Sequence, residues 1–222
     1  MALMKVQKVV VLGASGGCGK QLVEQAHAKG LSVRAVVRPS STFEFKNVET
    51  RRGDLSSVAF LTDCFNDQDI VLSALGLRMP GLAPWARPEV PDFLDTSTPA
   101  IIEAMRAAQV KRVMAISAGG VGDSHEGMPG MFKFFIAASA LRIAYAALDR
   151  MEKTYLASGL DVCLPRPTGL TDGPRTGLVL SNRQLTGRAT ISRADVAGWM
   201  LKALEQPTFM DRTPLITVTG AA

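Results

Sequence analysis

The first 30 residues constrain the fold more than any other part of the chain. Residues 6–12 form a valine-rich run that leads directly into Gly13, Gly16 and Gly19, and a helix-length segment follows up to Gly30. A strand, a glycine turn and a helix in this order form the unit that binds the pyrophosphate of a dinucleotide, because the amides at a helix N-terminus attract anions. This order predicts an α/β fold with a nucleotide site near the N-terminus.

The pair Gly19-Lys20 also resembles the end of the phosphate loop of nucleoside triphosphatases, G-x-x-x-x-G-K-[ST]. That loop requires a glycine and a hydroxyl residue where this chain has Ala14 and Gln21. We therefore favour the dinucleotide interpretation and take Lys20 as an ordinary first-turn helix residue. The loop residues that we expect to contact the cofactor are Gly13, Ala14, Ser15, Gly16, Gly17, Cys18 and Gly19.

Short apolar runs alternate with helix-length segments along the rest of the chain. We expect further strands at 31–37, 48–52, 69–74, 112–117, 161–164 and 215–219, and helices at 20–29, 58–65, from Thr98-Pro99 onward, at 131–157 and at 193–205. Thr98 would cap its helix with Pro99 at the first position, and Ser192 with Asp195 forms a capping box. Strand–helix alternation predicts a Rossmann-like, doubly wound parallel sheet. We expect one domain over residues 1–222, with a small substrate-side region near the C-terminus.

Composition narrows the function classes. The net charge is +5, but no basic run occurs and aromatic residues make up only 6% of the chain. A nucleic-acid partner is therefore not expected. The three cysteines and two histidines lie far apart, so we expect no metal site. No secretory signal is recognisable at the N-terminus, and we expect a cytoplasmic protein.

The most apolar stretch is residues 131–148, which Lys133 and Arg142 interrupt. These charges argue against a membrane span. We expect one long helix with a buried face; a substrate lid or a homodimer face is the alternative.

The end of the second predicted strand indicates which cofactor is bound. An NAD site generally has an acidic residue here, whereas an NADP site has an arginine for the 2′-phosphate. This strand ends at Arg38, followed by Ser40, Ser41 and Thr42, with no acid. Since a guanidinium binds phosphate oxygens through two parallel bonds, we predict NADP(H) rather than NAD(H), held by Arg38, Ser41 and Thr42.

Four motifs together resemble a known family. They are the glycine turn, the GDL of residues 53–55, the SALG of residues 73–76 and the SGLDVCLPRPTGLTDGP of residues 158–174. Their order and spacing resemble the atypical short-chain dehydrogenase/reductases, in particular the NAD(P)H-binding branch with biliverdin reductase B (flavin reductase) and the NmrA-like proteins. The resemblance covers nearly the whole chain.

The resemblance implies further site residues. Asp54 and Leu55 would contact adenine, although Asp54 could instead cap the following helix. Ala74, Leu75 and Gly76 would run past the adenine ribose, unless they are an ordinary strand exit. Ser117 would lie near the nicotinamide, in a pocket lined by Arg166, Pro167 and Thr168.

The wider superfamily uses a Tyr-x-x-x-Lys pair to protonate a carbonyl. Here Tyr145 is followed four residues later by Asp149, and Tyr155 by Gly159. Ser117 remains as the candidate catalytic residue, with positioning as its main task. His125 and Thr168 are further neighbours.

These observations favour an NADPH-dependent reductase of a small planar acceptor, such as a flavin, a quinone or a related molecule. One alternative is a non-catalytic NADP(H)-binding sensor or assembly factor; another is an isomerase or dehydratase with a bound cofactor. Cys18 carries a separate hypothesis, since a thiol at a helix start can have a lowered pKa and be redox-active. The favoured interpretation of Cys18 is a small residue that fills a tight turn.

Overall fold

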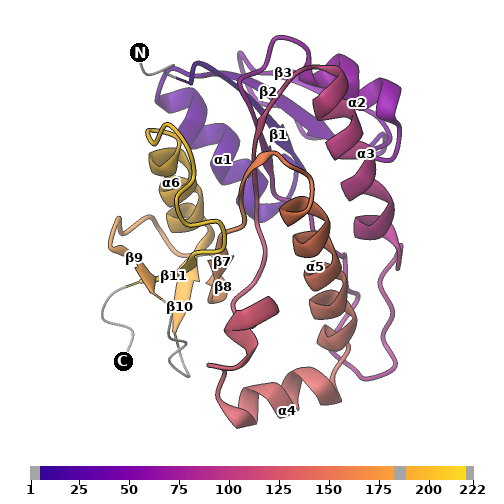
Figure 1. Ribbon diagram of the computed structural model, residues 1–222, viewed down its shortest axis with the longest axis vertical. Coiled ribbons are helices and arrows are strands. Elements are labelled where there is room, and N and C mark those ends of the chain that lie inside the picture. Colours follow the sequence, from indigo (N-terminus) through magenta and orange to yellow (C-terminus); the bar gives the residue numbers. More distant parts are fainter. Residues whose placement is uncertain (1–5, 183–188, 219–222) are drawn as a thin grey trace.

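A computed structural model describes residues 6–182 and 189–218 of the chain. Its main sheet has six parallel strands in the order β3-β2-β1-β4-β5-β6 (Figure 1). Their bounds are β1 (Lys8–Leu12), β2 (Ser32–Val37), β3 (Glu49–Arg52), β4 (Ile70–Ser73), β5 (Arg112–Ala115) and β6 (Asp161–Cys163). This architecture confirms the predicted Rossmann-like α/β class.

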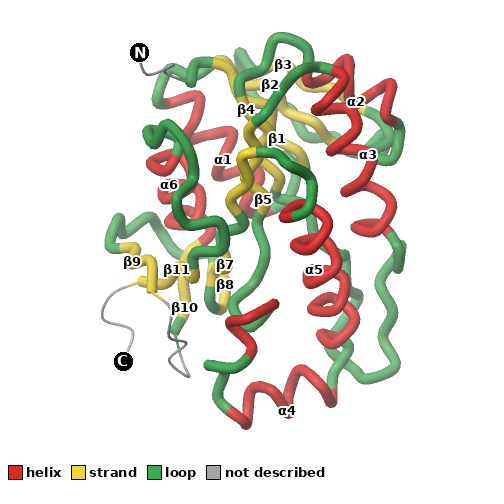
Figure 2. Tube along the Cα trace, viewed as in Figure 1, coloured by secondary structure: helices red, strands yellow, loops and turns green. Residues whose placement is uncertain are grey.

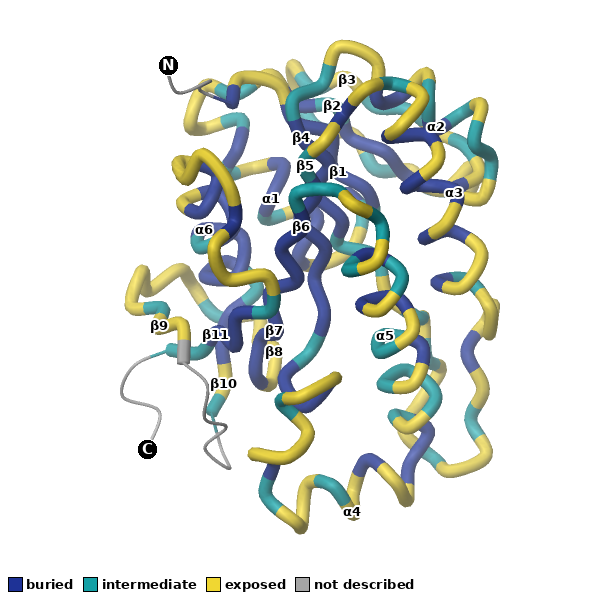
Figure 3. Tube along the Cα trace, in the orientation of Figure 1, coloured by how far each residue is buried: buried dark blue, intermediate teal, exposed yellow. Residues whose placement is uncertain are grey.

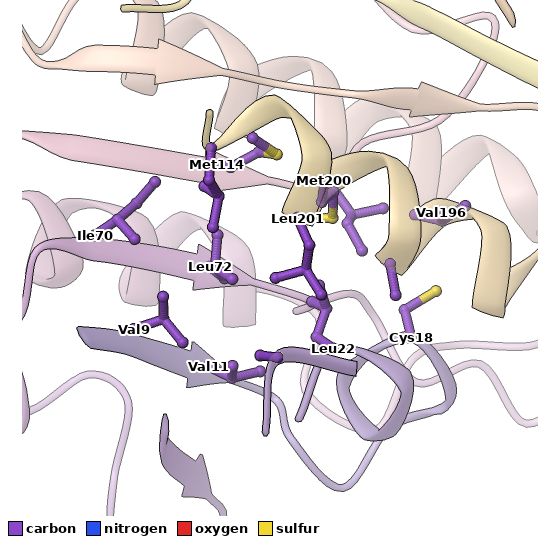
Figure 4. Packing of buried hydrophobic residues seen from close by; sticks show 14 of the residues in the cluster. Val9, Val11, Cys18, Leu22, Ile70, Leu72, Met114, Val196, Met200 and Leu201 are labelled. Atoms are coloured by element: carbon purple, nitrogen blue, oxygen red, sulfur yellow. The ribbon is translucent and has the colours of Figure 1, made fainter. Parts of the chain in front are cut away.

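Helices cover both faces of the main sheet. One face carries α1 (Gly17–Ala28) and α6 (Arg193–Ala203), and the other carries α2 (Val58–Phe65), α3 (Phe93–Ala107) and α5 (Leu141–Leu156). Val9 and Val11 of β1 pack into the first core together with Leu22 of α1 (Figure 4), whereas Val10 and Leu12 pack into the second. Burial on both faces explains why β1 is apolar at consecutive positions (Figure 3).

The C-terminal part adds two small sheets below the main sheet in the view of Figure 2. One has the order β7-β11-β9 and the other pairs β10 with β8. The strands are β7 (Arg166–Pro167), β8 (Gly169–Thr171), β9 (Val179–Asn182), β10 (Thr190–Ser192) and β11 (Leu215–Val218). The predicted last strand therefore exists but lies outside the main sheet, and Thr219 falls outside the described residues. These sheets form the expected small C-terminal region.

The predicted start of the third helix was wrong. α3 begins at Phe93, with Asp92 at the N-cap, and Pro99 lies inside the helix. Thr98 is buried and does not cap it. A proline at this position removes one backbone hydrogen bond. Burial of Leu94 and Ile101 in the second core outweighs that loss.

The single helix expected over residues 131–157 is in fact two helices. α4 (Gly130–Ala138) and α5 meet at an angle of 102°. Ser139 between them is extended; its hydroxyl donates to the carbonyl of Ile136 and accepts from the amide of Leu141. In α4 only Ile136 is buried, so the expected buried face is absent there.

This corner also bears on membrane insertion. No single helix in the described part of the chain is both long and apolar enough to cross a membrane, and only the bent pair α4–α5 meets the length and composition criteria together.

Candidate dinucleotide site

The strand order brings the predicted cofactor residues to one edge of the sheet. Arg38 follows β2, the glycine turn follows β1, Ala74–Gly76 follow β4 and Ser117 follows β5. These four strands are neighbours in that order, and all are parallel. The chain order reverses between β1 and β4, which is the point where open α/β sheets bind ligands at their carboxyl ends.

The glycine turn packs too closely for larger residues. Gly13 has φ +73°, and a Cβ there would lie 3.0 Å from the carbonyl oxygen of Ala74. A Cβ on Gly19 would lie 2.1 Å from the carbonyl oxygen of Gly13. The N-cap of α1 is Gly16, which has no side chain to bond the first amides of the helix. The turn therefore leaves a helix N-terminus ready for an anion such as a pyrophosphate.

Arg193 adds a cation to this turn that the sequence did not reveal. A Cβ on Gly17 would lie 2.5 Å from Cδ of Arg193, so this side chain lies directly over the start of α1. Its Nη1 donates to Oδ1 of Asp172 at 2.6 Å. Arg193 begins α6, and its place depends on the packing of α6 against α1, which no local pattern in the sequence indicates.

A cavity of about 540 Å³ lies between the start of α1 and the segment after β2. Its lining includes Ser15, Ser41 and Thr42, which were predicted, and Lys20, which was not. Within the described ranges Lys20 has no ion-pair partner. The lining also includes the carboxylates of Glu24 and Glu44, and Glu44 forms an ion pair with Arg52 at 3.3 Å. Lys20 and the three hydroxyl groups are the lining groups that can bind a phosphate.

Arg38 lies beside this segment, since its carbonyl accepts from the amide of Ser41 at 3.0 Å. Its side chain is 50% exposed, and Nη1 lies 3.7 Å from the carboxylate of Glu89. Such an exposed pair is weak, which leaves the guanidinium free to bind a phosphate.

The two residues expected at the adenine differ in their surroundings. Asp54 accepts from both the amide and the hydroxyl of Ser56, and these bonds lower the pKa of Asp54. It does not cap α2, because Ser57 does so through Phe60. Leu55 is buried in the second core. Their contact with adenine stays a prediction.

Ser117 is the most informative residue at the edge. Ser117 is only 5% exposed, and its Oγ has no hydrogen-bond partner within the part of the chain that the structure describes. The backbone is fixed, because its amide donates to the carbonyl of Pro165 at 2.9 Å. Buried polar atoms are nearly always paired, so this hydroxyl fits a ligand group such as a carboxamide.

The residues after β6 that were predicted to line the nicotinamide pocket interact with other groups of the protein. Arg166 donates to both carboxylate oxygens of Glu152, at 2.9 and 2.6 Å, and to Asp123. This cluster anchors the short 3₁₀ helix Gly122–His125. Pro167 pairs with β11, and the hydroxyl of Thr168 is 3.3 Å from that of Thr217. Contacts of all three with the nicotinamide stay predictions.

A second cavity, of about 460 Å³, lies between the segment after β5 and the helices α4 and α5, and we call it the α4–α5 cavity. Its lining includes Gly120, His125, Lys133, Ile136, Arg142, Tyr145 and Asp149. The Tyr145 hydroxyl donates to the carbonyl of Gly119 at 3.2 Å, and burial raises the pKa of Tyr145. Asp149, four residues after Tyr145, forms an ion pair with Lys153 at 2.7 Å.

The hypothesis of a lowered thiol pKa at Cys18 is contradicted, and the favoured interpretation of a packing residue is supported. Burial raises the pKa of this thiol to about 11, which outweighs the nearby positive charge of Arg193. The side chain lies in the first core, between α1 and α6 (Figure 4). Cys18 is therefore a packing residue and not an activated thiolate.

No group of three His, Cys, Asp or Glu side chains that could hold a metal ion occurs in residues 6–182 and 189–218.

The sheet, the glycine turn and the switch point define a Rossmann-type dinucleotide-binding protein. The chain belongs to the NAD(P)H-binding family, whose model matches residues 13–207. This confirms the family resemblance inferred from the sequence motifs.

Solved structures of known oxidoreductases share the fold. The anaerobillin reductase ChuY of Escherichia coli O157:H7 superposes with a TM-score of 0.78 and 21% identity, over 97% of this chain and 99% of that one. A short-chain dehydrogenase/reductase of Veillonella parvula in complex with NADP gives a TM-score of 0.76 at 14% identity, over 97% and 96%. An uncharacterized chloroplastic protein of Arabidopsis thaliana is 28% identical over 214 residues, which are 91% of this chain and 74% of that protein.

Proposed function

We propose that this protein is an NADPH-dependent reductase that delivers hydride to a small planar acceptor such as a flavin, a quinone or a related molecule. The observation that carries the proposal is the alignment along the sheet edge. A phosphate-type cavity, a glycine turn, an unpartnered buried hydroxyl at Ser117 and the α4–α5 cavity follow one another there.

The pyrophosphate and the 2′-phosphate of the cofactor would each have binding residues along this edge. The amides at the start of α1, together with Arg193, would hold the pyrophosphate. Lys20, Arg38, Ser41 and Thr42 would hold the 2′-phosphate, which favours NADP(H) over NAD(H). When bound, the cofactor supplies the hydride.

The residues of the chain itself would bind the cofactor and orient its nicotinamide. Ser117 would bond the carboxamide and fix which face of the nicotinamide is presented. Hydride transfer to a flavin or quinone needs close stacking more than a dedicated acid. The raised pKa of Tyr145 makes it a poor acid, and its hydroxyl already donates to Gly119. The shared fold with an anaerobillin reductase supports reductase chemistry on this scaffold.

One observation favours a second candidate, an NADP(H)-binding sensor or assembly factor. Helix α4 exposes Met131 to 86% and Phe134 to 73%, a face suited to another protein surface, including a second copy of this chain. A sensor would bind NADP(H) tightly and turn over no acceptor. The homodimer and the cytoplasmic location expected from the sequence stay predictions.

Turnover separates the two candidates. We expect NADPH oxidation with at least one flavin or quinone in a panel, at a rate proportional to enzyme concentration and well above the reaction in free solution. Tight NADPH binding with no enzyme-dependent turnover across the panel would contradict the reductase and favour the sensor.

A further inference from the structure

The α4–α5 cavity carries an excess of positive charge at its lining. His125, Lys133 and Arg142 contribute the basic groups, and Asp149 is the carboxylate among the lining residues. Asp149 forms an ion pair with Lys153 at 2.7 Å. Lys133 and Arg142 therefore outnumber the carboxylate of the lining, and that carboxylate already has another cation as its partner.

The cations bond only to neutral groups. Nζ of Lys133 donates to the carbonyl of Glu126 at 3.2 Å. Arg142 donates to the carbonyls of Ser139 and Pro84, at 2.9 and 3.1 Å. Neither has a carboxylate within ion-pair distance among residues 6–182 and 189–218. Carbonyl bonds orient these side chains and leave their charge available to a ligand.

The rest of the lining is suited to a flat apolar body. Ile136 and Ala137 of α4, Val121 and the ring of Tyr145 contribute apolar groups to the lining. A volume of about 460 Å³ lies within the range of small-molecule sites. The first lining residue, Gly120, follows Ser117 by three positions in the chain.

We propose that the acceptor of this enzyme carries an anionic group, a phosphate or a carboxylate, and that Lys133 and Arg142 bind it. Both are specificity-determining residues that place the planar ring toward Ser117. This inference rests on the proposed reductase function, but it concerns the acceptor and not the cofactor.

Matched pairs of acceptors test it. FMN and riboflavin share one ring system, and FMN adds a phosphate. A benzoquinone with a carboxylate side chain and its methyl ester form the second pair. The two pairs distinguish a phosphate from a carboxylate as the group that is bound.

The variant is Lys133→Gln, which keeps a donor for the carbonyl of Glu126 and removes the charge. Lys133→Arg restores the charge and serves as the rescue. Lys111→Gln is the control, because Lys111 lies at the opposite end of β5 from Ser117. We expect Lys133→Gln to raise KM for the preferred anionic acceptor about fivefold to tenfold. KM for the neutral partner should change less than about twofold, since no ionic contact is lost.

The outcomes separate the two proposals. Equal effects on the charged and neutral acceptors, or no effect on either, would overturn the anion site while turnover itself supports the reductase. If the wild type turns over no acceptor, FMN binding in the presence of NADP⁺ decides. If Lys133→Gln binds FMN more weakly than the wild type while Lys133→Arg and Lys111→Gln do not, the anion site stands without the reductase. If the wild type does not bind FMN, or if Lys133→Gln binds FMN as tightly as the wild type, the anion site is overturned.

Discussion

Ser117 and Ser139 have the same low exposure, 5%, but opposite hydrogen-bond states. The hydroxyl of Ser139 has partners on both sides of the α4–α5 corner, whereas that of Ser117 has none among the described residues. An unpartnered buried hydroxyl costs stability, and a ligand group bonded to Ser117 would offset that cost.

Ser117→Ala should therefore separate stability from function. We expect the melting temperature of the cofactor-free protein to stay the same or rise, because the variant removes an unsatisfied group. The Kd for NADPH should rise about fivefold, the effect of one lost hydrogen bond. Ser139→Ala is the control, with a lower melting temperature and unchanged NADPH binding. A loss of stability in Ser117→Ala together with unchanged NADPH binding would show that the serine is structural.

For single residues, the sequence indicated those positions at which the local backbone decides which residue type fits. Gly13, Gly16 and Gly19 could be assigned because the turn itself demands them. Lys20 and Arg193 could not, because each reaches the site only when separate elements pack: Lys20 against the segment after β2, and Arg193 through the contact of α6 with α1.

At the element scale, the start of α6 contains a carboxylate with many donors. Asp195 is buried, and it accepts from the hydroxyl of Ser192, the amide and hydroxyl of Thr176 and the amide of Gly177. Burial alone would raise its pKa, but these bonds outweigh burial and hold the pKa of Asp195 below its usual value. The predicted N-cap at Ser192 is confirmed, since its hydroxyl accepts from the amide of Asp195. The Asp195 carboxylate bonds the Ser192 hydroxyl and not its backbone amide, and it also fixes the chain before β9.

This pKa shift gives a pH dependence with a definite sign. A carboxyl group with a lowered folded-state pKa stabilises the protein above its unfolded pKa of about 3.9, and the stabilisation is lost as the pH falls through the folded value. Asp195→Asn should cost about 1–3 kcal/mol at neutral pH, since an amide cannot accept from all four donors. It should also lose less of its free energy of unfolding than the wild type when the pH falls below 4.

Urea unfolding between pH 7 and pH 3 measures both effects. Asp67→Asn is the control, because Asp67 is exposed and its φ of +62° is a conformation that asparagine tolerates well. An equal loss of stability in the wild type and Asp195→Asn on acidification would contradict the role assigned to Asp195.

Helix boundaries were less predictable than helix existence. Thr98-Pro99 has the composition of a helix start, but burial along α3 extends the helix to Phe93. Residues 131–148 are mostly apolar, so composition gave no sign of the corner at Ser139. At this corner the amide of Ala140 donates to the carbonyl of Leu82 at 3.2 Å. In both cases a tertiary contact outweighed the local pattern.

At the scale of the whole molecule, the order β3-β2-β1-β4-β5-β6 is what makes distant motifs one site. Alternation of strands and helices predicted a parallel sheet with right-handed crossovers. The resemblance then implied which strand ends meet the cofactor. The C-terminal sheets were not predictable in the same way, because strands of two to four residues leave little periodicity to read.

Calorimetry on the wild type and Arg38→Glu measures whether this edge binds NADPH in preference to NADH. Arg78→Glu is the matched control, because Arg38 and Arg78 both lie near the carboxylate of Glu89, at 3.7 and 3.6 Å. We predict that the wild type and Arg78→Glu bind NADPH at least about tenfold more tightly than NADH, and that Arg38→Glu loses this preference. Equal affinity of the wild type for both cofactors, or a preference that survives in Arg38→Glu, would contradict the account.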